Sequence, residues 1–319
     1  MSTETPQHKG ADIPTIYTIS LIIPTYQGEQ WLRALLHMLA QQTLLPDETI
    51  VVDSSSNDQT RAIAKSFQVT VVKIQTSDFD HGGTRSMAAR IAKGDLLVYM
   101  TQDAIPEDIY ALERLVVPLV RDSSIAATFG RQLPNKDASP LSEHLRLFNY
   151  ADKGYVRRWQ DRKEYGFKTI FISNSFAAYR KSCLAEVNYF PENIIFGEDT
   201  CTLAKLLQRG YGVEYVSDAR VYHSHNYTFI QDGKRYFDIG VLHTLEQTLV
   251  AQFGTPTGAG KRFVLSEISF LFKRKKYILI LQSLLRNTMK YFAYGLGRRY
   301  SVLPRSLART LSMHPRWWK

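Results

Sequence analysis

Short apolar runs alternate with helical patterns between residues 17 and 106, and this alternation restricts the fold more than any other feature of the chain. Strands and helices that alternate at this pace form right-handed βαβ units. The sequence therefore predicts an α/β fold with a doubly wound, mostly parallel sheet. The expected strands are 17–23, 49–52, 69–74 and 96–100, and the expected helices are 29–42, 59–67 and 84–92.

Two aspartates follow expected strands. Asp53 comes directly after the second strand, and Asp103 follows the fourth strand after two polar residues. Ligands of open α/β proteins bind at the carboxyl ends of the strands, so both carboxylates are expected in one crevice. Two structural alternatives stay open. Asp103 would cap a helix that opens near Pro106, and Asp53 would form a turn with the serines that follow it.

A glycine pair stands before one of the expected helices. Gly82 and Gly83 allow close backbone approach, and the free N–H groups at the start of a helix bind anions. Arg85 could add a guanidinium contact, so this segment is a candidate for binding a diphosphate. A flexible turn with a solvated Arg85 is the alternative. The chain has no GxGxxG or GxxxxGK[ST] pattern, which argues against a dinucleotide site of the Rossmann type and against a P-loop.

Two further groups of polar residues follow later in the chain. Glu198 and Asp199 precede an expected helix, where the helix dipole alone also favours acids. His223 and His225 are two residues apart after an expected strand, so they would point the same way and could face one ion. A histidine hydrogen-bonded in the core is the competing account. Together with Asp103, these residues indicate a metal-assisted transfer reaction.

The order of these segments resembles the family 2 glycosyltransferases of the GT-A fold, which transfer a sugar from a nucleotide diphosphate with inversion. The resemblance is carried by SLIIPTYQGEQWLRALLHMLAQQ, VVDSSSNDQT, GDLLVYMTQDAIP and FGEDTCTLAKLLQRGYGVEYVSDARVYHSH, between residues 20 and 225. Within that family, DFDHGGTRS, YMTQDAIP, VYHSH and the closing LPRSLARTLSMHPRWW are most similar to bacterial rhamnosyltransferases of O-antigen and capsule assembly. The implied organisation is a flexible N-terminus (1–16), a Rossmann-like GT-A domain (17–228) and a basic helical C-terminal region (229–319).

The resemblance also implies roles for single residues on the donor side. Asp103 matches the metal-binding position of the family's DxD motif, and His223 would complete the shell around Mg²⁺ or Mn²⁺. Gln102 and Ala104 replace the acids usual beside that position, so the substrate phosphates and water would supply most of the metal ligands. The residues expected to contact the nucleotide sugar are Pro24, Thr25, Tyr26, Asp53, Arg85, Gln102 and Asp103.

On the acceptor side, the resemblance implies a catalytic carboxylate. Glu198 and Asp199 match the family's ED motif, in which the aspartate is usually the general base. A base is needed because the acceptor hydroxyl must lose its proton as it attacks the anomeric carbon opposite the departing diphosphate. Which of the two acids serves is left open by the sequence, with Asp199 preferred. Asn174 and His225 are expected on the acceptor side of the pocket.

The positive charge of the chain is concentrated near its end. Residues 261–319 contain 14 Lys and Arg and a single acid, so they carry +13, whereas the rest of the chain carries −3 of the total of +10. With helices expected at 230–252 and 268–294, this region could lie on an anionic inner membrane leaflet. A solvated helical face is the alternative. No recognisable DNA- or RNA-binding motif supports nucleic-acid binding.

The sequence thus predicts a metal-dependent inverting glycosyltransferase. The expected donor is dTDP-rhamnose, and the expected acceptor is a lipid-linked saccharide or a polysaccharide. Two other hypotheses are a transferase of the same fold that uses a UDP-sugar and a non-catalytic membrane-docking protein. No run of about 18 apolar residues and no apolar signal core occur, so we expect a cytoplasmic protein that is peripheral on the inner face of the membrane. The two cysteines lack ligand spacing and are expected to be reduced.

Overall fold

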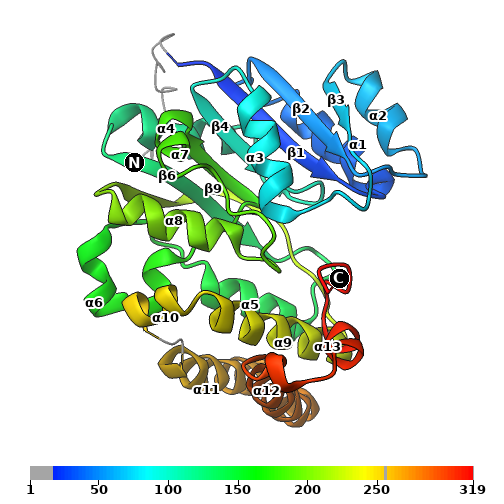
Figure 1. The fold of residues 1–319 in the computed structure, drawn as a ribbon, viewed down its shortest axis with the longest axis vertical. Helices are drawn as coiled ribbons and strands as arrows, with labels where there is room; N and C mark the ends of the chain where they lie inside the picture. The colour runs from blue at the N-terminus through cyan, green and yellow to red at the C-terminus, as the bar shows by residue number, and fades with distance from the viewer. Residues whose placement is uncertain (1–16, 255–256, 319) are drawn as a thin grey trace, which may run out of the picture.

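A nine-stranded sheet with helices on both faces forms the upper part of the molecule in Figure 1, above the C-terminal helices. The computed structural model describes residues 17–254 and 257–318, so the expected flexible N-terminus at 1–16 lies outside the described residues. The strand order is β3-β2-β1-β4-β8-β6-β9-β5, and β7 pairs with β9. The strands are β1 (Ile19–Thr25), β2 (Glu48–Asp53), β3 (Thr70–Lys73), β4 (Leu96–Met100), β5 (Ile105–Pro106), β6 (Ile125–Leu133), β7 (Tyr155–Arg157), β8 (Phe176–Arg180) and β9 (Gly212–Tyr222).

The sheet is mostly parallel, as the sequence predicts. Strand β1 pairs in parallel with β2 and with β4, and β2 pairs in parallel with β3. Strands β6 and β9 are also parallel to each other. Strand β8 runs antiparallel between β4 and β6. The carboxyl ends of β1, β2 and β4 therefore share one edge of the sheet with the start of β8.

Helices cover both faces of the sheet because their apolar residues recur at helical spacing. Helix α1, for example, buries Leu32, Leu35, Leu36 and Leu39. One face packs against α1 (Glu29–Leu39), α2 (Thr60–Ser66) and α4 (Ala111–Arg121). The other packs against α3 (His81–Ile91), α7 (Lys181–Glu186) and α8 (Glu198–Gln208). The connecting elements are α5 (Pro140–Asn149), α6 (Arg162–Tyr165) and the 3₁₀ turns Trp159–Asp161 and Gly166–Ile170.

Two expectations about prolines near the site edge are wrong. Strand β1 does not stop before Pro24 but continues to Thr25, because its pairing with β4 ends at Ile22 and Pro24 faces only β2 there. Pro106 does not open a helix. It lies in β5, which pairs with β9, and α4 begins later with Tyr110 as its N-cap. Asp103 therefore does not cap a helix.

The C-terminal region is helical, but its helices are divided differently from the expectation. The expected helix at 230–252 is interrupted at Glu246, and the expected helix at 268–294 is wrong, because the chain reverses at Lys275, whose φ is +58°. The helices are α9 (Phe229–Leu245), α10 (Gln247–Phe253), α11 (Thr257–Lys273), α12 (Tyr277–Gly297) and α13 (Arg305–Leu311), with a 3₁₀ turn at Tyr300–Val302.

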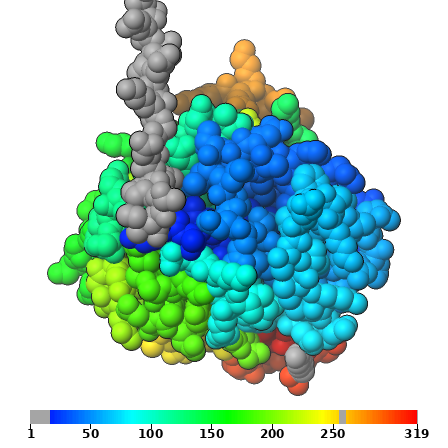
Figure 2. All heavy atoms as spheres, turned by 90° about the horizontal axis from the view of Figure 1, so that it is seen from above, coloured from blue at the N-terminus to red at the C-terminus, as the bar shows by residue number. Residues whose placement is uncertain are grey.

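The last described residues return to the sheet-containing part of the molecule. The Trp317 indole N–H donates to the carbonyl of Asn193 at 2.9 Å, and Arg316 donates to the carbonyl of Thr76 at 3.3 Å. Figure 2 shows the red C-terminal residues at the edge of the molecule next to the cyan and green segments. These contacts tie the end of the chain to loops on the α3 and α8 side of the sheet.

Within the described ranges 17–254 and 257–318, none of the helices combines the length and the apolar character that crossing a bilayer requires. Both cysteines, Cys183 and Cys201, are buried free thiols, as expected from their spacing.

Candidate active site

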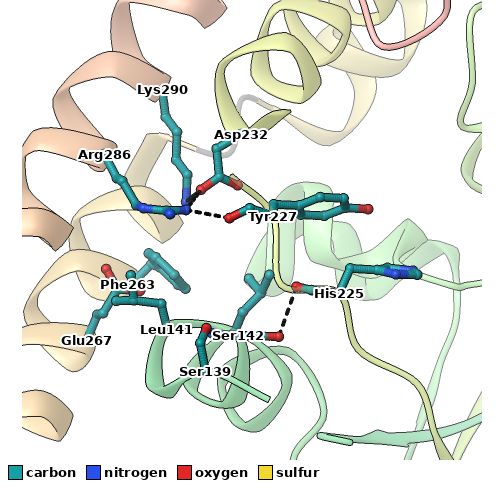
Figure 3. A pocket seen from close by; sticks show the side chains of 11 residues that line it. Ser139, Leu141, Ser142, His225, Tyr227, Asp232, Phe263, Glu267, Arg286 and Lys290 are labelled. Carbon is teal, nitrogen blue, oxygen red and sulfur yellow. Dashed lines mark hydrogen bonds and ion pairs between the residues drawn. The ribbon is translucent and has the colours of Figure 1, made fainter. Parts of the chain in front are cut away.

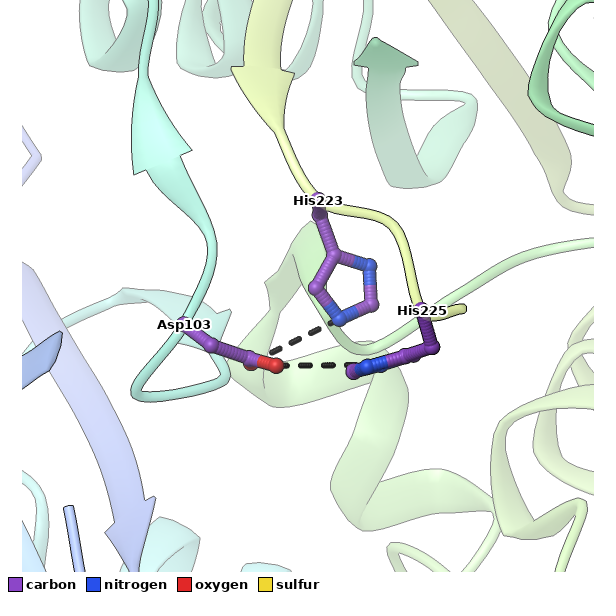
Figure 4. Close-up of side chains that lie close together, drawn as sticks. All are labelled: Asp103, His223 and His225. Carbon is purple, nitrogen blue, oxygen red and sulfur yellow. Dashed lines mark ion pairs between the residues drawn. The ribbon is translucent and has the colours of Figure 1, made fainter. Parts of the chain in front are cut away.

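Asp103 and two histidines meet at the edge of the sheet (Figure 4). The Asp103 carboxylate oxygens lie 3.5 Å from Nε2 of His223 and 3.7 Å from Nε2 of His225. The short antiparallel pairing of β5 with β9 produces this contact. It pairs Ile105 with Tyr222, so Asp103 and His223, which lie just beyond the paired residues, come close together. The two histidines face one point, as the sequence predicts, although β9 ends before them at Tyr222.

Gln132 fixes the orientation of the His223 ring. Its side-chain oxygen lies 2.9 Å from Nδ1 of His223 and also accepts from Arg146, while its amide N–H₂ donates to Ser173. An oxygen that serves as acceptor requires Nδ1 to carry the hydrogen, so the lone pair of a neutral His223 lies on Nε2. Nε2 faces the Asp103 carboxylate, so it donates to that carboxylate when the ring is protonated and presents its lone pair there when the ring is neutral.

The three side chains at this point can hold a divalent cation. Their ligand atoms lie within 4.8 Å of one another, and theirs is the one His/Cys/Asp/Glu group of this kind among the residues that the structure describes. Burial raises the pKa of Asp103, but the hydrogen bond and charge of His223 outweigh this effect and hold that pKa far below its usual value. Burial and the nearby His223 lower the pKa of His225 to about 4, which leaves it neutral and able to ligate.

Glu198 and Asp199 lie at the first turn of α8 in different surroundings. Glu198 is 5% exposed and pairs with Arg85 at 3.1 Å. Burial raises the pKa of Glu198, but the charges of Arg85 and His81 outweigh it and lower the pKa overall. Asp199 accepts from the backbone N–H of Asn174 at 3.2 Å. Burial and the charge of Glu198 raise the pKa of Asp199 to about 7.

Asn174 and Arg85 support this acidic pair. The Asn174 side-chain N–H₂ donates to Glu198 at 3.2 Å, and its oxygen accepts from the Tyr179 hydroxyl at 2.7 Å. Arg85 is only 5% exposed and also donates to the carbonyl of His81. The structure therefore shows Arg85 buried beside Glu198 rather than solvated, in a contact that the sequence did not predict.

The expected nucleotide side of the site lies along β1, β2 and β4. Asp53 is fully buried, and its carboxylate accepts from the backbone N–H and the hydroxyl of Ser56 and lies 3.7 Å from Arg61. The turn with the following serines, which the sequence left open, is thus present. Thr25 donates to Asp53 at 3.3 Å, so the same carboxylate links β1 to β2.

Tyr26 and Gln102 connect two loops at the same edge. The Gln102 side chain accepts from the Tyr26 N–H and donates to the Tyr26 carbonyl, both at 3.0 Å. Gly28 permits this contact, since a Cβ at that position would lie 2.3 Å from the Gln102 oxygen. The Tyr26 ring is 45% exposed, next to Pro24 and Thr25.

Comparison with known proteins identifies the family. Residues 20–187, more than half of the chain, match Glycosyl transferase family 2. The chain belongs to this family. It is 44% identical over 302 residues to the O-antigen chain rhamnosyltransferase RfbN of Salmonella typhimurium, with 94% of this chain and 96% of the relative covered. It is 42% identical over 307 residues to the O-antigen chain rhamnosyltransferase WbaN of Salmonella anatum, with the same coverage.

Solved structures share the fold of this family 2 glycosyltransferase. The mannosyltransferase PcManGT of Pyrobaculum calidifontis, solved with GDP-Man and Mn²⁺, superposes with a TM-score of 0.65 at 16% identity, covering 94% of this chain and 92% of that one. Residues 1–349 of TarS from Staphylococcus aureus, in complex with UDP-GlcNAc, give a TM-score of 0.53 at 17% identity, covering 93% and 84%. The expected GT-A fold with a helical C-terminal region is confirmed.

A small cavity of about 30 Å³ adjoins His225, one of the three side chains able to hold a cation in this glycosyltransferase (Figure 3). His225 lies on its wall, so this residue faces both Asp103 and the expected acceptor side. Arg286 and Lys290 reach the cavity from α12 and share the carboxylate of Asp232, at 2.7 Å and 3.5 Å. The C-terminal helices therefore contribute to the surroundings of the site.

Sequence reasoning missed Gln132, which orients His223, and the hydrogen bond by which Tyr179 orients Asn174, although 174–179 was expected on the acceptor side. Both lie on strands, β6 and β8, that were not predicted from the sequence. Alternation of polar and apolar residues could not have found them, because both strands are buried on both faces, as their burial patterns show.

Proposed function

We propose that this glycosyltransferase transfers L-rhamnose from dTDP-rhamnose to a lipid-linked saccharide during O-antigen synthesis, with inversion at the anomeric carbon. The choice of sugar is supported by the identity of 42–44% with two O-antigen chain rhamnosyltransferases over nearly the whole chain. The reaction type is supported by one observation above all. The carboxyl group of Asp199, with a pKa raised to about 7, accepts from the backbone N–H of Asn174, and the neighbouring Ser173 accepts from Gln132, which orients His223 of the group able to bind a cation.

Asp199 is the general base in this proposal. The acceptor oxygen forms a bond with the anomeric carbon while its proton moves to the Asp199 carboxylate, and the bond to the diphosphate breaks with its electron pair staying on phosphate oxygen. A pKa near 7 suits this role, since about half of the groups are charged at neutral pH and the charged form still binds a proton strongly. Glu198 is held by Arg85 and keeps the charge that raises the pKa of Asp199.

Asp103, His223 and His225 would hold the divalent cation, Mg²⁺ or Mn²⁺. When bound, the cation stabilises the negative charge that develops on the departing diphosphate. The donor set fits such an ion, because Gln132 turns Nε2 of His223 toward the Asp103 carboxylate, so that the two residues would offer an imidazole nitrogen and a carboxylate oxygen to it. Three protein ligands leave further positions for phosphate oxygens and water.

The nucleotide would lie against Pro24, Thr25, Tyr26 and Gln102. The exposed Tyr26 ring offers a stacking surface, and Gln102 holds its backbone in place. In this proposal Asp53 shapes the loop through Ser56 and Thr25, and a base could hydrogen-bond to it only by displacing one of those contacts. Asn174 positions Asp199 on the acceptor side through its backbone N–H. The enzyme would act at the inner face of the cytoplasmic membrane, where its lipid-linked acceptor is anchored.

The test is a donor comparison with product analysis. Purified protein is incubated with Mg²⁺ or Mn²⁺, a lipid-diphosphate-linked saccharide, and either dTDP-L-rhamnose or a UDP-sugar, and the product is examined by NMR. The proposal expects rhamnosylated product from the dTDP sugar, with an anomeric configuration opposite to that of the donor. Product from a UDP-sugar alone would assign another donor, and retention of configuration would exclude Asp199 as the base.

A further inference from the structure

Helix α12 has its polar and apolar sides reversed relative to an ordinary surface helix. Its inner side carries polar groups, among them Ser283, 1% exposed, and Lys290, 9% exposed. Its outer side carries large apolar groups, such as Ile278 at 87% exposed and Phe292 at 64%. Helices that face water show the opposite arrangement. The outer side of α12 is therefore built for a partner other than water.

Buried ionic and hydrogen-bonded contacts lock α12 in this orientation. Glu267 of α11 accepts from the Ser283 hydroxyl and from the Asn287 side chain. Arg286 and Lys290 pair with the buried Asp232 of α9. Turning the apolar side inward would leave the buried carboxylates of Glu267 and Asp232 without these partners, which costs free energy.

The apolar residues form one continuous stripe, which we call the docking face. Their spacing of three, four or seven residues places them on one side of the helix, and the stripe extends for about 27 Å at 1.5 Å per residue. It lies on the outermost pair of helices, at the bottom of Figure 1. The docking face consists of Ile278, Leu281, Leu285, Phe292 and Leu296 of α12 with Phe272 of α11.

Positive charges stand at both ends of the docking face. Lys273, Lys275 and Lys276 are exposed in the turn between α11 and α12, and Arg299 is exposed just after α12. Residues 268–319 contain no acid. Apolar side chains framed by exposed cations match the chemistry of an anionic bilayer surface, where the acyl boundary takes the apolar groups and the headgroups take the charges.

We propose that the docking face binds peripherally to an anionic phospholipid bilayer, with α12 lying in the plane of the headgroups. A second copy of this chain fits the face less well. A two-fold pairing of the stripes would bring the lysine turn of one copy to the basic end of the other, with no acid in that segment to offset the repulsion. A bilayer supplies both the apolar layer and the anions.

The inner side of the same helix explains why such docking would help the reaction. Arg286 and Lys290 line the cavity next to His225 (Figure 3). Docking therefore holds the acceptor side of the site one helix away from the lipid surface. The use of a lipid-linked acceptor rests on the proposed function, whereas the docking face follows from α11 and α12 alone.

Vesicle sedimentation of the full chain tests the docking face. Vesicles of phosphatidylcholine alone are compared with vesicles of phosphatidylcholine and phosphatidylglycerol, at low and high salt. We expect binding to the anionic vesicles that weakens with salt. Ile278→Gln with Leu281→Gln should weaken it at least about tenfold. Lys273→Gln, Lys275→Gln and Lys276→Gln together should weaken it about a hundredfold at low salt.

Matched variants control for the number and type of substitutions. Leu45→Gln with Ile91→Gln, both exposed apolar residues of the sheet-containing part, and Lys65→Gln, Lys153→Gln and Lys163→Gln together should leave vesicle binding unchanged. Equal loss with the control variants, or equal binding by the docking-face variants, would overturn the proposal. So would a dimer that the docking-face variants dissociate while the wild type ignores vesicles.

Activity on a short water-soluble saccharide acceptor separates the two proposals. The docking-face variants should keep this activity while losing transfer to acceptor embedded in vesicles. Vesicle binding without rhamnosyl transfer would leave the docking face standing and refute the proposed function. Normal transfer to vesicle-embedded acceptor by the docking-face variants would refute the docking face.

Discussion

At the scale of single residues, neighbouring acids in this site differ because their partners differ. Glu198 has Arg85 at 3.1 Å, and Asp199 has two backbone N–H groups, those of Asn174 and Thr200, but no cation within ion-pair distance in the described structure. The pKa values accordingly move apart, with that of Glu198 lowered and that of Asp199 raised to about 7. The sequence suggested a base within this pair, but it could not choose between the two acids because the choice depends on the distant Arg85.

The raised pKa of Asp199 predicts a pH dependence. The base must be charged to accept a proton, so kcat should fall about tenfold per unit as the pH drops below about 7 and level off above it. Glu198→Gln removes the negative neighbour and should move the inflection to lower pH. A pH–rate profile of rhamnosyl transfer for both proteins checks this. An inflection that stays in place in the variant would show that Glu198 does not control Asp199.

Arg85 is predicted to act through Glu198. Arg85→Met leaves a buried carboxylate without its cation and should lower the free energy of unfolding by about 3–5 kcal/mol. Adding Glu198→Gln should recover much of that loss, because the uncompensated charge is gone. Urea unfolding of the wild type, the two single variants and the double variant measures the coupling. If Arg85 instead binds the diphosphate, Arg85→Met would raise the KM for the donor and leave the unfolding free energy unchanged.

Gln132 is predicted to tune metal binding through His223. Gln132→Leu removes the acceptor that holds Nδ1, so the Mn²⁺ concentration for half-maximal activity should rise about 10- to 100-fold. Ser173→Ala, which removes the contact on the other end of Gln132 together with the acceptor of the Ser175 N–H, is the control and should change little. Titration of activity with Mn²⁺ after removal of metal by a chelator makes the comparison. Equal curves for all three proteins would count against His223 as a ligand.

At the scale of elements, the sequence pattern predicted those strands and helices whose bounds depend on residues close together in the chain. The strand at 96–100 was predicted with its final bounds because five consecutive buried residues end at a polar turn. The pairing of β5 with β9, which brings Asp103 to His223, joins segments more than 100 residues apart and has no local signal. The reversal at Lys275 was missed for a similar reason. A lysine in the left-handed backbone region cannot be recognised from the spacing of apolar residues. The sequence predicted that His223 and His225 face one point, but it did not predict the β5–β9 pairing that brings them to Asp103.

Close packing of α9 against α12 gives a prediction at this scale. A Cβ on Gly297 would lie 2.0 Å from the carbonyl of Phe237, so Gly297→Ala should lower the free energy of unfolding by about 1–3 kcal/mol. Gly295→Ala in the same helix meets nothing within 4 Å and should stabilise the protein by up to about 1 kcal/mol through helix propensity. Urea unfolding of both variants checks the contrast. Equal effects would mean that the two helices are not in close contact at Gly297.

At the scale of the whole molecule, the sheet-containing part and the C-terminal helices carry different features of the site. The sheet edge and the first turn of α8 carry the group able to bind a cation and the acidic pair, and the C-terminal helices supply part of the cavity wall and the exposed apolar stripe. From the +13 of residues 261–319, against the −3 of the rest, and from a helical pattern, the sequence suggested that the C-terminal region docks on a membrane. It could not predict that α12 turns its apolar side outward, because that orientation depends on ion pairs with Asp232 of another helix.

The central claim is that Asp199 removes the acceptor proton in a metal-assisted rhamnosyl transfer. The most direct test measures kcat with dTDP-L-rhamnose for the wild type and Asp199→Asn, alongside the thermal shift that dTDP produces in each. Loss of a general base should lower kcat at least about a hundredfold, while the dTDP-induced shift stays the same. Transfer by Asp199→Asn at the wild-type rate would contradict the claim, and so would a wild type that binds dTDP but transfers no sugar.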